Sequence, residues 1–342
     1  MKSKEWVVRS LCTVIIITCG LAVFLNLYNY NYYFNHNALN INKFQPDERK
    51  YKTNYLNNNE NNYDSILLGS SSTTYINENY FEKFKVFNYS VSGMIPLEYQ
   101  HAIKHLESKN KGDIKNIFIA LEFFTSNYNE VTRINKFNIG HYILESEDNL
   151  YVLKELLNLA SLRNIIADNV RTGDFEKYYI RWGNVHHTKI FNEKLVSEKI
   201  KAGIKKHTKE FAAYTYHMRY KDELLSLKKN NSNKNFYIII TPVAKPYMDL
   251  ILKNKFQSYI AWLEETVEVF ESIYIYPYSN SITNNYLTNF KDNRHYYPIV
   301  GKEIVDSIFN ENDNELILLT KNNIGSYLSD LVIKRKALMN DN

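Results

Sequence analysis

Short apolar segments alternate with longer segments of helical periodicity through most of the chain after residue 62. The apolar segments span 65–69, 85–91, 116–124, 235–243 and 272–278. Several of them are apolar at consecutive positions, which is typical of strands that are buried on both faces. The helical segments between them span 96–109, 245–268 and 298–309. This alternation predicts an α/β fold in which helices cover both faces of a parallel sheet of about five strands.

A long interval separates the third and fourth predicted strands. Residues 125–234 are too many for a simple crossover, and helical patterns around 147–168 and 191–229 favour a helical insertion beside the site. The last residues, 313–342, predict a C-terminal helix with a basic end. We therefore expect one main domain over 63–312.

An apolar segment of membrane-spanning length stands near the N-terminus. Residues 11–27 are almost wholly apolar, and extending the segment back to Trp6 makes it long enough to cross a bilayer as a helix. Its N-terminal flank is basic, at Lys2, Lys4 and Arg9, whereas the residues that follow it are uncharged. The positive-inside rule therefore predicts a transmembrane anchor at 1–28, with a cytoplasmic N-terminus and an extracytoplasmic domain.

A cleaved signal peptide is the alternative to this anchor. The segment is followed by Asn, Tyr and Phe rather than by the small residues of a cleavage site, which favours an anchor that is retained. Thr18 is a poor residue to precede a lipidated Cys19. Since Cys12 and Cys19 both lie in the segment, the exported part forms no disulfide. Residues 29–62, which are polar and rich in Asn, predict a spacer.

Composition excludes several classes of function. A net charge of +5 over 342 residues is mild and no long basic run occurs, so we expect no nucleic-acid partner. Neither a G-x-G-x-x-G motif nor a P-loop is present, so we expect no nucleotide cofactor. His101 and His105 are four residues apart on a predicted helix, as zinc ligands often are. Without an intervening H-E-x-x-H glutamate, or a cysteine outside the anchor, we expect no metal site.

The first predicted strand ends in a glycine and three serines, "SILLGSSSTTYI" at 65–76. In an open parallel sheet, ligands bind beyond the carboxyl ends of the strands. A serine at that end is exposed, and the N–H groups of the following turn stabilise negative charge. The alternative is that Ser70, Ser71 or Ser72 only caps the next helix, since a serine hydroxyl needs a base to become a nucleophile.

Two further segments supply candidates for the rest of a serine-nucleophile site. In "FKDNRHYYPIVGKEI", Asp292 precedes His295 by three residues, which allows the carboxylate to hold one ring nitrogen while the other faces a serine. A surface ion pair is the alternative. In "FNYSVSGMIP", Gly93 follows the second strand and can bring its N–H close to an oxyanion. A plain strand-to-helix turn is the alternative there.

Together these three segments resemble the SGNH or GDSL-type hydrolase superfamily, whose members fold as flavodoxin-like three-layer sandwiches. The resemblance implies a Ser-His-Asp triad of Ser71, His295 and Asp292, with Gly93 as an oxyanion donor. The third block of the family departs from the pattern, because its Gly-x-Asn-Asp is absent from "IFIALEFFTSN". In that segment Asn127 is the implied oxyanion side chain, although Glu122 stands near the expected place.

The anchor and the insertion also make the chain similar to bacterial envelope proteins that move acyl groups. Examples are alginate and peptidoglycan O-acetyltransferases and the D-alanine transfer protein of teichoic acid synthesis. The resemblance implies a cofactor-free serine esterase or O-acyltransferase in the bacterial inner membrane. Its implied substrates are acyl esters of a cell-surface polysaccharide or another acylated glycan, and its implied partner is a multi-span membrane acyltransferase. The alternative is a non-catalytic assembly protein that keeps the fold and binds glycan or membrane partners.

Overall fold

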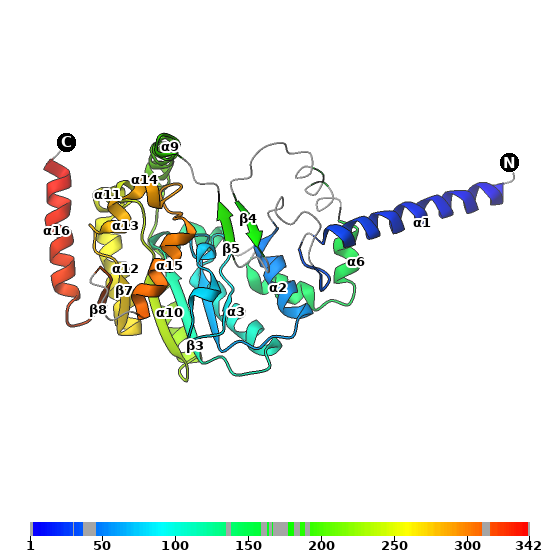
Figure 1. The fold of residues 1–342 in the computed structure, drawn as a ribbon, viewed down its shortest axis with the longest axis horizontal. Coiled ribbons are helices and arrows are strands. Elements are labelled where there is room, and N and C mark those ends of the chain that lie inside the picture. Colours follow the sequence, from blue (N-terminus) through cyan, green and yellow to red (C-terminus); the bar gives the residue numbers. More distant parts are fainter. Residues whose placement is uncertain are drawn as a thin grey trace.

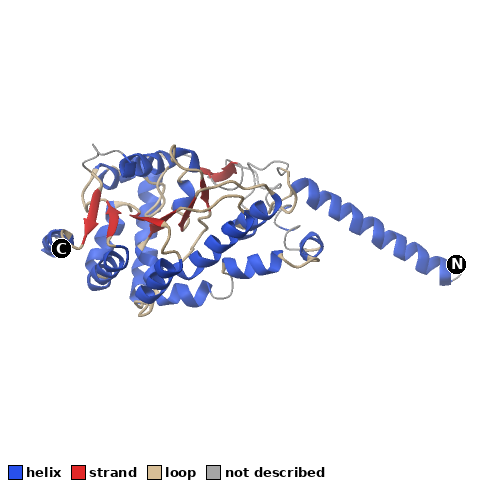
Figure 2. Ribbon diagram, turned by 90° about the horizontal axis from the view of Figure 1, so that it is seen from below, coloured by secondary structure: helices blue, strands red, loops and turns tan. Residues whose placement is uncertain are grey.

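The computed structural model describes residues 3–29, 31–36, 46–134, 138–158, 163, 166, 177–180, 185–188, 192–309 and 315–340. Within this part, six strands form one sheet in the order β2-β1-β3-β6-β7-β8, with helices on both faces (Figures 1 and 2). The strands are β1 (Ser65–Gly69), β2 (Val86–Asn88), β3 (Asn116–Leu121), β6 (Asn235–Ile240), β7 (Ser272–Ile275) and β8 (Ile317–Thr320). The first five pair in parallel, and β8 runs antiparallel to β7.

The helices before the fourth strand of the sheet are α1 (Ser3–Tyr28), α2 (Glu48–Asn58), α3 (Pro96–Lys109), α4 (Tyr128–Ile134), α5 (Ile139–Ser146), α6 (Tyr151–Leu156), α9 (Glu193–Ala212) and α10 (Tyr220–Asn230). The later helices are α11 (Lys245–Asn254), α12 (Phe256–Phe270), α13 (Ser281–Asn284), α14 (Tyr286–Asn289), α15 (Pro298–Phe309) and α16 (Ile324–Asn340). Short 3-10 turns follow β1 and β3, namely η2 (Thr73–Tyr75) and η4 (Phe123–Ser126), and η3 (Glu78–Tyr80) precedes β2.

The consecutive apolar residues of the central strands divide between two hydrophobic cores. In β1, Ile66 and Leu68 face one core, while Leu67 faces the other. β3 and β6 divide in the same alternating way. Because side chains alternate along a strand, a run that is apolar at every position needs a covered surface on both sides. The expectation of an α/β fold with a mostly parallel, doubly covered sheet is therefore confirmed.

Two expected helical segments differ in the structure. The segment 313–342, expected to be a helix alone, contains β8 before α16. Only Leu319 of β8 is buried, so this short edge strand gives a weak apolar pattern. The predicted helix at 245–268 divides at Lys255 into α11 and α12.

The expected spacer at 29–62 differs most, because α2 lies inside the folded body. Its N-cap Asp47 accepts hydrogen bonds from the backbone N–H groups of Arg49 and Lys50. Tyr51 and Leu56 are buried in the same core as β1, and α2 packs against α3 and α5. Asparagine-rich composition hid this helix, since its apolar contacts come largely from tyrosines whose hydroxyls also need polar partners.

The long interval 125–234 contains helices as expected, and Lys206, Glu210 and Phe211 of α9 line the cavity that also contains Ser71. α10 packs against α3 and α12, so it covers the sheet as a crossover helix does. The interval is not wholly helical, because β4 (Lys177–Ile180) and β5 (Val185–Thr188) pair as an antiparallel hairpin. The helix expected around 147–168 is described over α6, and most of its remainder lies outside the described residues.

Helix α1 extends away from the body, as Figure 1 shows. It is long and apolar enough to cross a membrane, and it is mostly exposed in the structure. An anchor and a signal sequence share these properties. Both cysteines of the chain are exposed on this helix.

Candidate active site

Three side chains from distant parts of the chain meet beyond the carboxyl end of β1. Ser71 Oγ lies 2.8 Å from Nε2 of His295, a residue 224 positions later. The other ring nitrogen, Nδ1, lies 2.9 Å from both carboxylate oxygens of Asp292. A ring that carries its single proton on Nδ1, toward Asp292, presents Nε2 as an acceptor for the Ser71 hydroxyl. This is the order of contacts that activates a serine nucleophile.

The loop that carries Asp292 and His295 is shaped by the aspartate itself. Asp292 Oδ1 accepts hydrogen bonds from the backbone N–H groups of Arg294, at 3.0 Å, and His295, at 2.9 Å. Short side chains of this kind close such local turns readily. Burial alone would raise the pKa of Asp292, but His295 and these N–H donors hold that pKa well below its usual range. The carboxylate is therefore ionised at neutral pH.

The three serines after β1 differ in what their hydroxyls contact. Ser70 and Ser72 are buried, whereas Ser71 is half-buried. The Ser70 hydroxyl donates to the carboxylate of Glu122, and the Ser72 hydroxyl donates to the carbonyl of Arg294 at 3.2 Å. Ser72 precedes η2 without a side-chain capping bond to it. The flanking serines thus hold the turn in place and leave Ser71 facing the histidine.

Gly69 is required at the end of β1 for space. A Cβ atom at this position would collide with the Thr73 hydroxyl and would stand 2.9 Å from the carbonyl oxygen of Ala120 on β3. The glycine therefore allows the turn that bears Ser71 to fold tightly over the neighbouring strand.

Gly93 lies in the loop between β2 and α3, in the left-handed region at φ +66°. The Arg133 guanidinium packs against it, since Nη2 would lie 2.6 Å from a Cβ atom added there. Gly93 and Ser71 both line a cavity of about 500 Å³. The structure therefore brings the expected backbone donor to the same cavity as the serine.

Asn127 follows η4 and lines the same cavity. Its Oδ1 accepts hydrogen bonds of 3.2 Å from the backbone N–H groups of Asn129 and Thr215. This places the carbonyl end of the amide in the loop and leaves Nδ2 as its donor end. Glu122 is instead buried beneath the serine turn, so it supports the position of Ser70.

The cavity also has a charged and aromatic lining that the sequence analysis did not anticipate. The basic side chains are Arg133, Lys206 and Arg294, the acidic ones are Glu130 and Glu210, and the rings are Phe124, Phe211, Tyr214 and Tyr247. The Arg294 guanidinium lies 4.7 Å from the centre of the Phe124 ring. Burial opposes its charge, but Tyr247 and Glu122 raise the pKa of Arg294. The position of Arg294 inside the Asp-x-x-His segment was the sequence signal that could have predicted its place beside the site.

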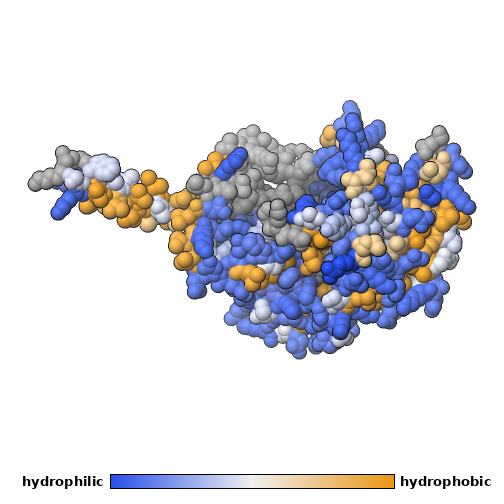
Figure 3. All heavy atoms as spheres, turned by 180° about the vertical axis from the view of Figure 1, so that it is seen from behind, coloured by the Kyte–Doolittle hydropathy of each residue, from blue (hydrophilic) through white to orange (hydrophobic). Residues whose placement is uncertain are grey.

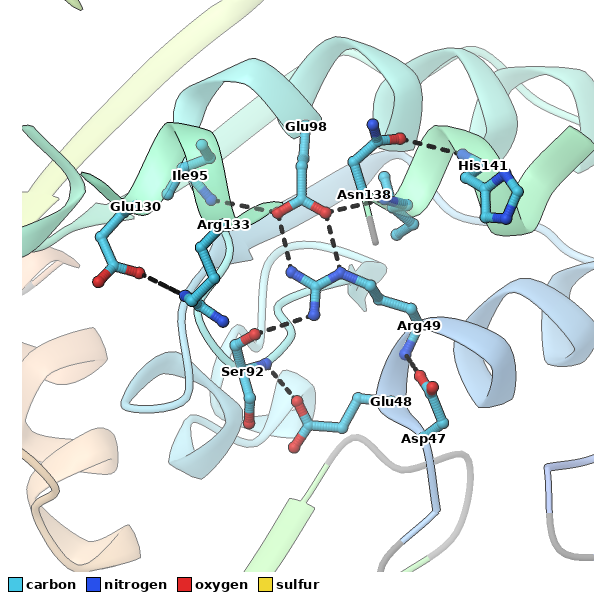
Figure 4. Close-up of polar contacts among 11 residues, drawn as sticks. Asp47, Glu48, Arg49, Ser92, Ile95, Glu98, Glu130, Arg133, Asn138 and His141 are labelled. Atoms are coloured by element: carbon cyan, nitrogen blue, oxygen red, sulfur yellow. Dashed lines mark hydrogen bonds and ion pairs between the residues drawn. The ribbon is translucent and has the colours of Figure 1, made fainter. Parts of the chain in front are cut away.

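Helix α2 holds the backbone of the Gly93 loop through buried polar side chains (Figure 4). Lys52 Nζ donates to the carbonyl of Asn88, at 2.8 Å, and to that of Ser90, at 2.6 Å. Arg49 Nη1 donates to the carbonyl of Ser92 at 2.9 Å, and the Glu48 carboxylate accepts from the Ser92 N–H. Burial lowers the pKa of Lys52 to about 8. The segment expected to be a spacer therefore shapes the loop that presents Gly93.

A buried ion pair ties this contact to two further helices. Arg49 donates to both carboxylate oxygens of Glu98 on α3, at 2.9 and 2.8 Å. Glu98 also accepts from the backbone N–H of Ile139, the first residue of α5, at 2.8 Å. Figure 4 shows Glu98 at the centre of these contacts. Since every oxygen of the carboxylate has a donor, the pair meets the conditions for a buried charge.

Of the two histidines of α3, His105 is buried and has side-chain partners at both ring nitrogens. The His105 ring contacts the Tyr89 hydroxyl at 2.7 Å and the Asn57 side chain at 3.0 Å. Burial lowers the pKa of His105 to about 3, so the ring is neutral. Among the described residues, no group of three or more His, Cys, Asp or Glu side chains is placed to hold a metal ion.

Comparison with known proteins adds little to this geometry. No family model matches the chain, and no curated protein matches it. A solved structure from Streptococcus pneumonia, described as a provisional platelet activating factor, is 10% identical and has a TM-score of 0.35. The similarity covers 76% of this chain and 87% of that one. A likeness at this level carries no argument about activity.

Proposed function

We propose that this chain is a serine esterase or O-acyltransferase of the SGNH type that acts on acyl esters of a cell-envelope glycan. The observation that carries the proposal is the hydrogen-bonded series Ser71, His295 and Asp292 beside a cavity. The strand order β2-β1-β3-β6-β7, all parallel, also supports a flavodoxin-like sandwich.

In the first half-reaction, Ser71 Oγ attacks the carbonyl carbon of the ester while its proton passes to Nε2 of His295. Asp292 stabilises the resulting imidazolium. The N–H groups of Gly93 and Ser71 hold the oxyanion, and Asn127 Nδ2 is the additional donor. When the tetrahedral intermediate collapses, the leaving alcohol takes the proton from His295 and the acyl group remains on Ser71.

The second half-reaction differs only in the acceptor. Water gives a free acid and makes the protein an esterase, whereas a sugar hydroxyl gives a new ester and makes it a transferase. In both cases His295 removes the acceptor's proton and returns it to Ser71 Oγ. No step needs a cofactor. A multi-span membrane acyltransferase is the proposed source of acyl groups if the protein acts as a transferase.

The size and lining of the cavity support a substrate larger than a short acyl group. Its volume of about 500 Å³ lies within the range of small-molecule sites, about 300–1,000 Å³. Tyr214 and Tyr247 offer ring faces, and charged side chains offer hydrogen bonds. Such a surface suits a sugar that carries the ester.

The proposed location is the bacterial inner membrane, with α1 as a single-pass anchor and the catalytic domain outside the cytoplasm. The exposed apolar surface of α1 and the basic residues near its start, Lys4 and Arg9, support this orientation.

Covalent labelling tests the proposal. The full chain in detergent would be treated with a fluorophosphonate and examined by intact mass and peptide mapping. We expect one adduct, on Ser71, that disappears in His295→Ala and persists in Ser72→Ala, which changes a neighbouring hydroxyl. A folded protein without an adduct would instead favour a non-catalytic assembly protein that binds glycan or membrane partners.

A further inference from the structure

We propose that a leucine surface formed by Leu150, Leu153 and Leu157 rests in the outer boundary of the bilayer that α1 crosses. The inference depends on the proposed membrane-spanning role of α1 and is independent of the chemistry of Ser71. It gives the folded domain a second membrane contact besides its covalent anchor.

These leucines are unusually exposed for large apolar side chains. Their exposed fractions are 55% for Leu150, 52% for Leu153 and 45% for Leu157. Leu150, Leu153 and Leu157 are spaced at three and four residues, so they share one face of α6 and its ends. A gathering of exposed apolar side chains on one face usually marks a site of contact with a partner or a membrane.

The opposite side of α6 is occupied by the body of the protein. Tyr151 is buried, and Glu155 accepts hydrogen bonds from Lys50, at 2.8 Å, and from the Tyr33 hydroxyl, at 2.6 Å. The helix is thus held in one orientation, and the leucine surface is the side that remains outside.

Packing against α1 sets the depth of this surface. Leu156 of α6 packs on Leu25 of α1, in a small cluster that also includes Phe24. A hydrocarbon core of about 30 Å takes roughly 20 helical residues. Counted from Trp6, that length ends at Leu25. Helix α6 therefore lies beside the outer end of the hydrocarbon core, and its outward leucines meet lipid.

The surroundings of the surface favour lipid chains over charged headgroups as the contact. Figure 3 shows apolar residues along α1 and on the adjoining part of the body. The charged neighbours Asp148 and Lys154 pair with each other, and Glu145 and Glu147 are acidic. With no basic cluster among these described residues, attraction to anionic lipid does not explain the contact, whereas burial of leucine side chains does.

A fluorescence experiment on the full chain tests this depth. In a Cys12→Ser, Cys19→Ser background, single cysteines at Leu153, Val14 or Met218 would be labelled with a nitrobenzoxadiazole probe. The proteins would be reconstituted into phosphatidylcholine and phosphatidylglycerol vesicles that contain spin-labelled lipid. Val14 reports on the anchor. Met218, 86% exposed between α9 and α10, reports on the aqueous side.

We expect lipid quenching at Leu153→Cys to exceed that at Met218→Cys at least threefold and to be insensitive to salt. Equal quenching at these two positions, with strong quenching at Val14→Cys, would overturn the inference and leave the anchor intact. A blue-shifted but unquenched probe at Leu153→Cys would place protein over the leucines and would also overturn it. Absence of quenching at Val14→Cys would instead refute the anchor on which the inference rests.

Discussion

The turn after β1 places three identical hydroxyls in three different environments. Ser70 is bound to a buried carboxylate and Ser72 to a backbone carbonyl, so their orientations are set by the body. Ser71 alone of the three contacts a histidine ring. Reactivity at this turn therefore depends on the partner of each hydroxyl rather than on its sequence context.

We expect Ser71→Ala to lower turnover of an activated acyl ester by about 10⁴-fold or more, because it removes the atom that becomes acylated. Its melting temperature should stay close to that of the parent, because the substitution removes only a half-buried hydroxyl whose one side-chain contact is the His295 ring. Ser72→Ala is the matched control and should keep most of the turnover. Full turnover in Ser71→Ala would refute the proposed nucleophile.

Asp292→Asn should keep the loop but lower kcat by about 10³ to 10⁴-fold, because an amide does not stabilise the imidazolium.

The same substitution should also change how the stability of the fold depends on pH in acid. The folded-state pKa of Asp292 lies below the unfolded value of about 3.9, so ionisation stabilises the fold above that pH and this contribution is lost on acidification. Urea unfolding at pH 7 and pH 3 should therefore show a smaller difference between parent and variant at pH 3. If the free energies of unfolding of parent and variant differed by the same amount at pH 7 and pH 3, Asp292 would not be a carboxylate with a lowered pKa in the folded state.

Helix α2 connects the segment that follows α1 to the Gly93 loop of the candidate site. Its side chains at Glu48, Arg49 and Lys52 bind backbone groups of residues 88–92, just before Gly93. An oxyanion donor is effective only where it is held in advance of the reaction. The element thus belongs to the site although it touches no substrate.

Arg49→Met is expected to lower the free energy of unfolding by about 3 kcal/mol, because it leaves the buried Glu98 carboxylate without its cation. The double variant Arg49→Met, Glu98→Leu should recover part of that stability, because it removes the unpaired carboxylate but also takes the acceptor from the Ile139 N–H. It should still show a lower kcat with little change in KM, because the hydrogen bond from Arg49 to the carbonyl of Ser92 remains lost. Urea unfolding and steady-state kinetics provide the two readouts.

Lys111→Met, which removes an exposed ion pair with Glu60, is the control for the Arg49 variants and should change neither quantity. Recovery of kcat together with stability in the double variant would show that α2 acts only on folding.

The molecule as a whole combines an apolar helix with a domain whose cavity lies at one edge of the sheet. If α1 is a retained anchor, only one end of the chain is accessible from outside the cell. Lys4 and Arg9 near the start of α1, together with the uncharged residues after it, favour that orientation.

Thiol labelling in intact cells tests it in the Cys12→Ser, Cys19→Ser background. A membrane-impermeant maleimide should label Met218→Cys and should label Ser3→Cys only after lysis. The mass of the purified chain should include α1. Labelling of both positions in intact cells, or loss of the mass of α1, would contradict a retained anchor with a cytoplasmic N-terminus.

Local sequence was sufficient for features that depend on neighbouring residues. Consecutive apolar positions in β1, β3 and β6 require two covered faces, and the apolar length of α1 is sufficient to cross a membrane. The spacing of Asp292 and His295 indicated one shared loop, and in the structure His295 contacts both Asp292 and Ser71. Each of these features depends on residues that lie close together in the sequence, so periodicity and spacing reveal it.

Tertiary structure decided what depends on residues far apart. It showed which of three serines meets the histidine, that α2 is part of the core, that β8 adds an antiparallel edge, and that Arg294 and Arg133 line the cavity. It also placed Leu153 on the outer side of a helix that packs against α1. The local sequence does not reveal any of these features, because the environment of a side chain depends on which distant segment packs against it in the folded protein.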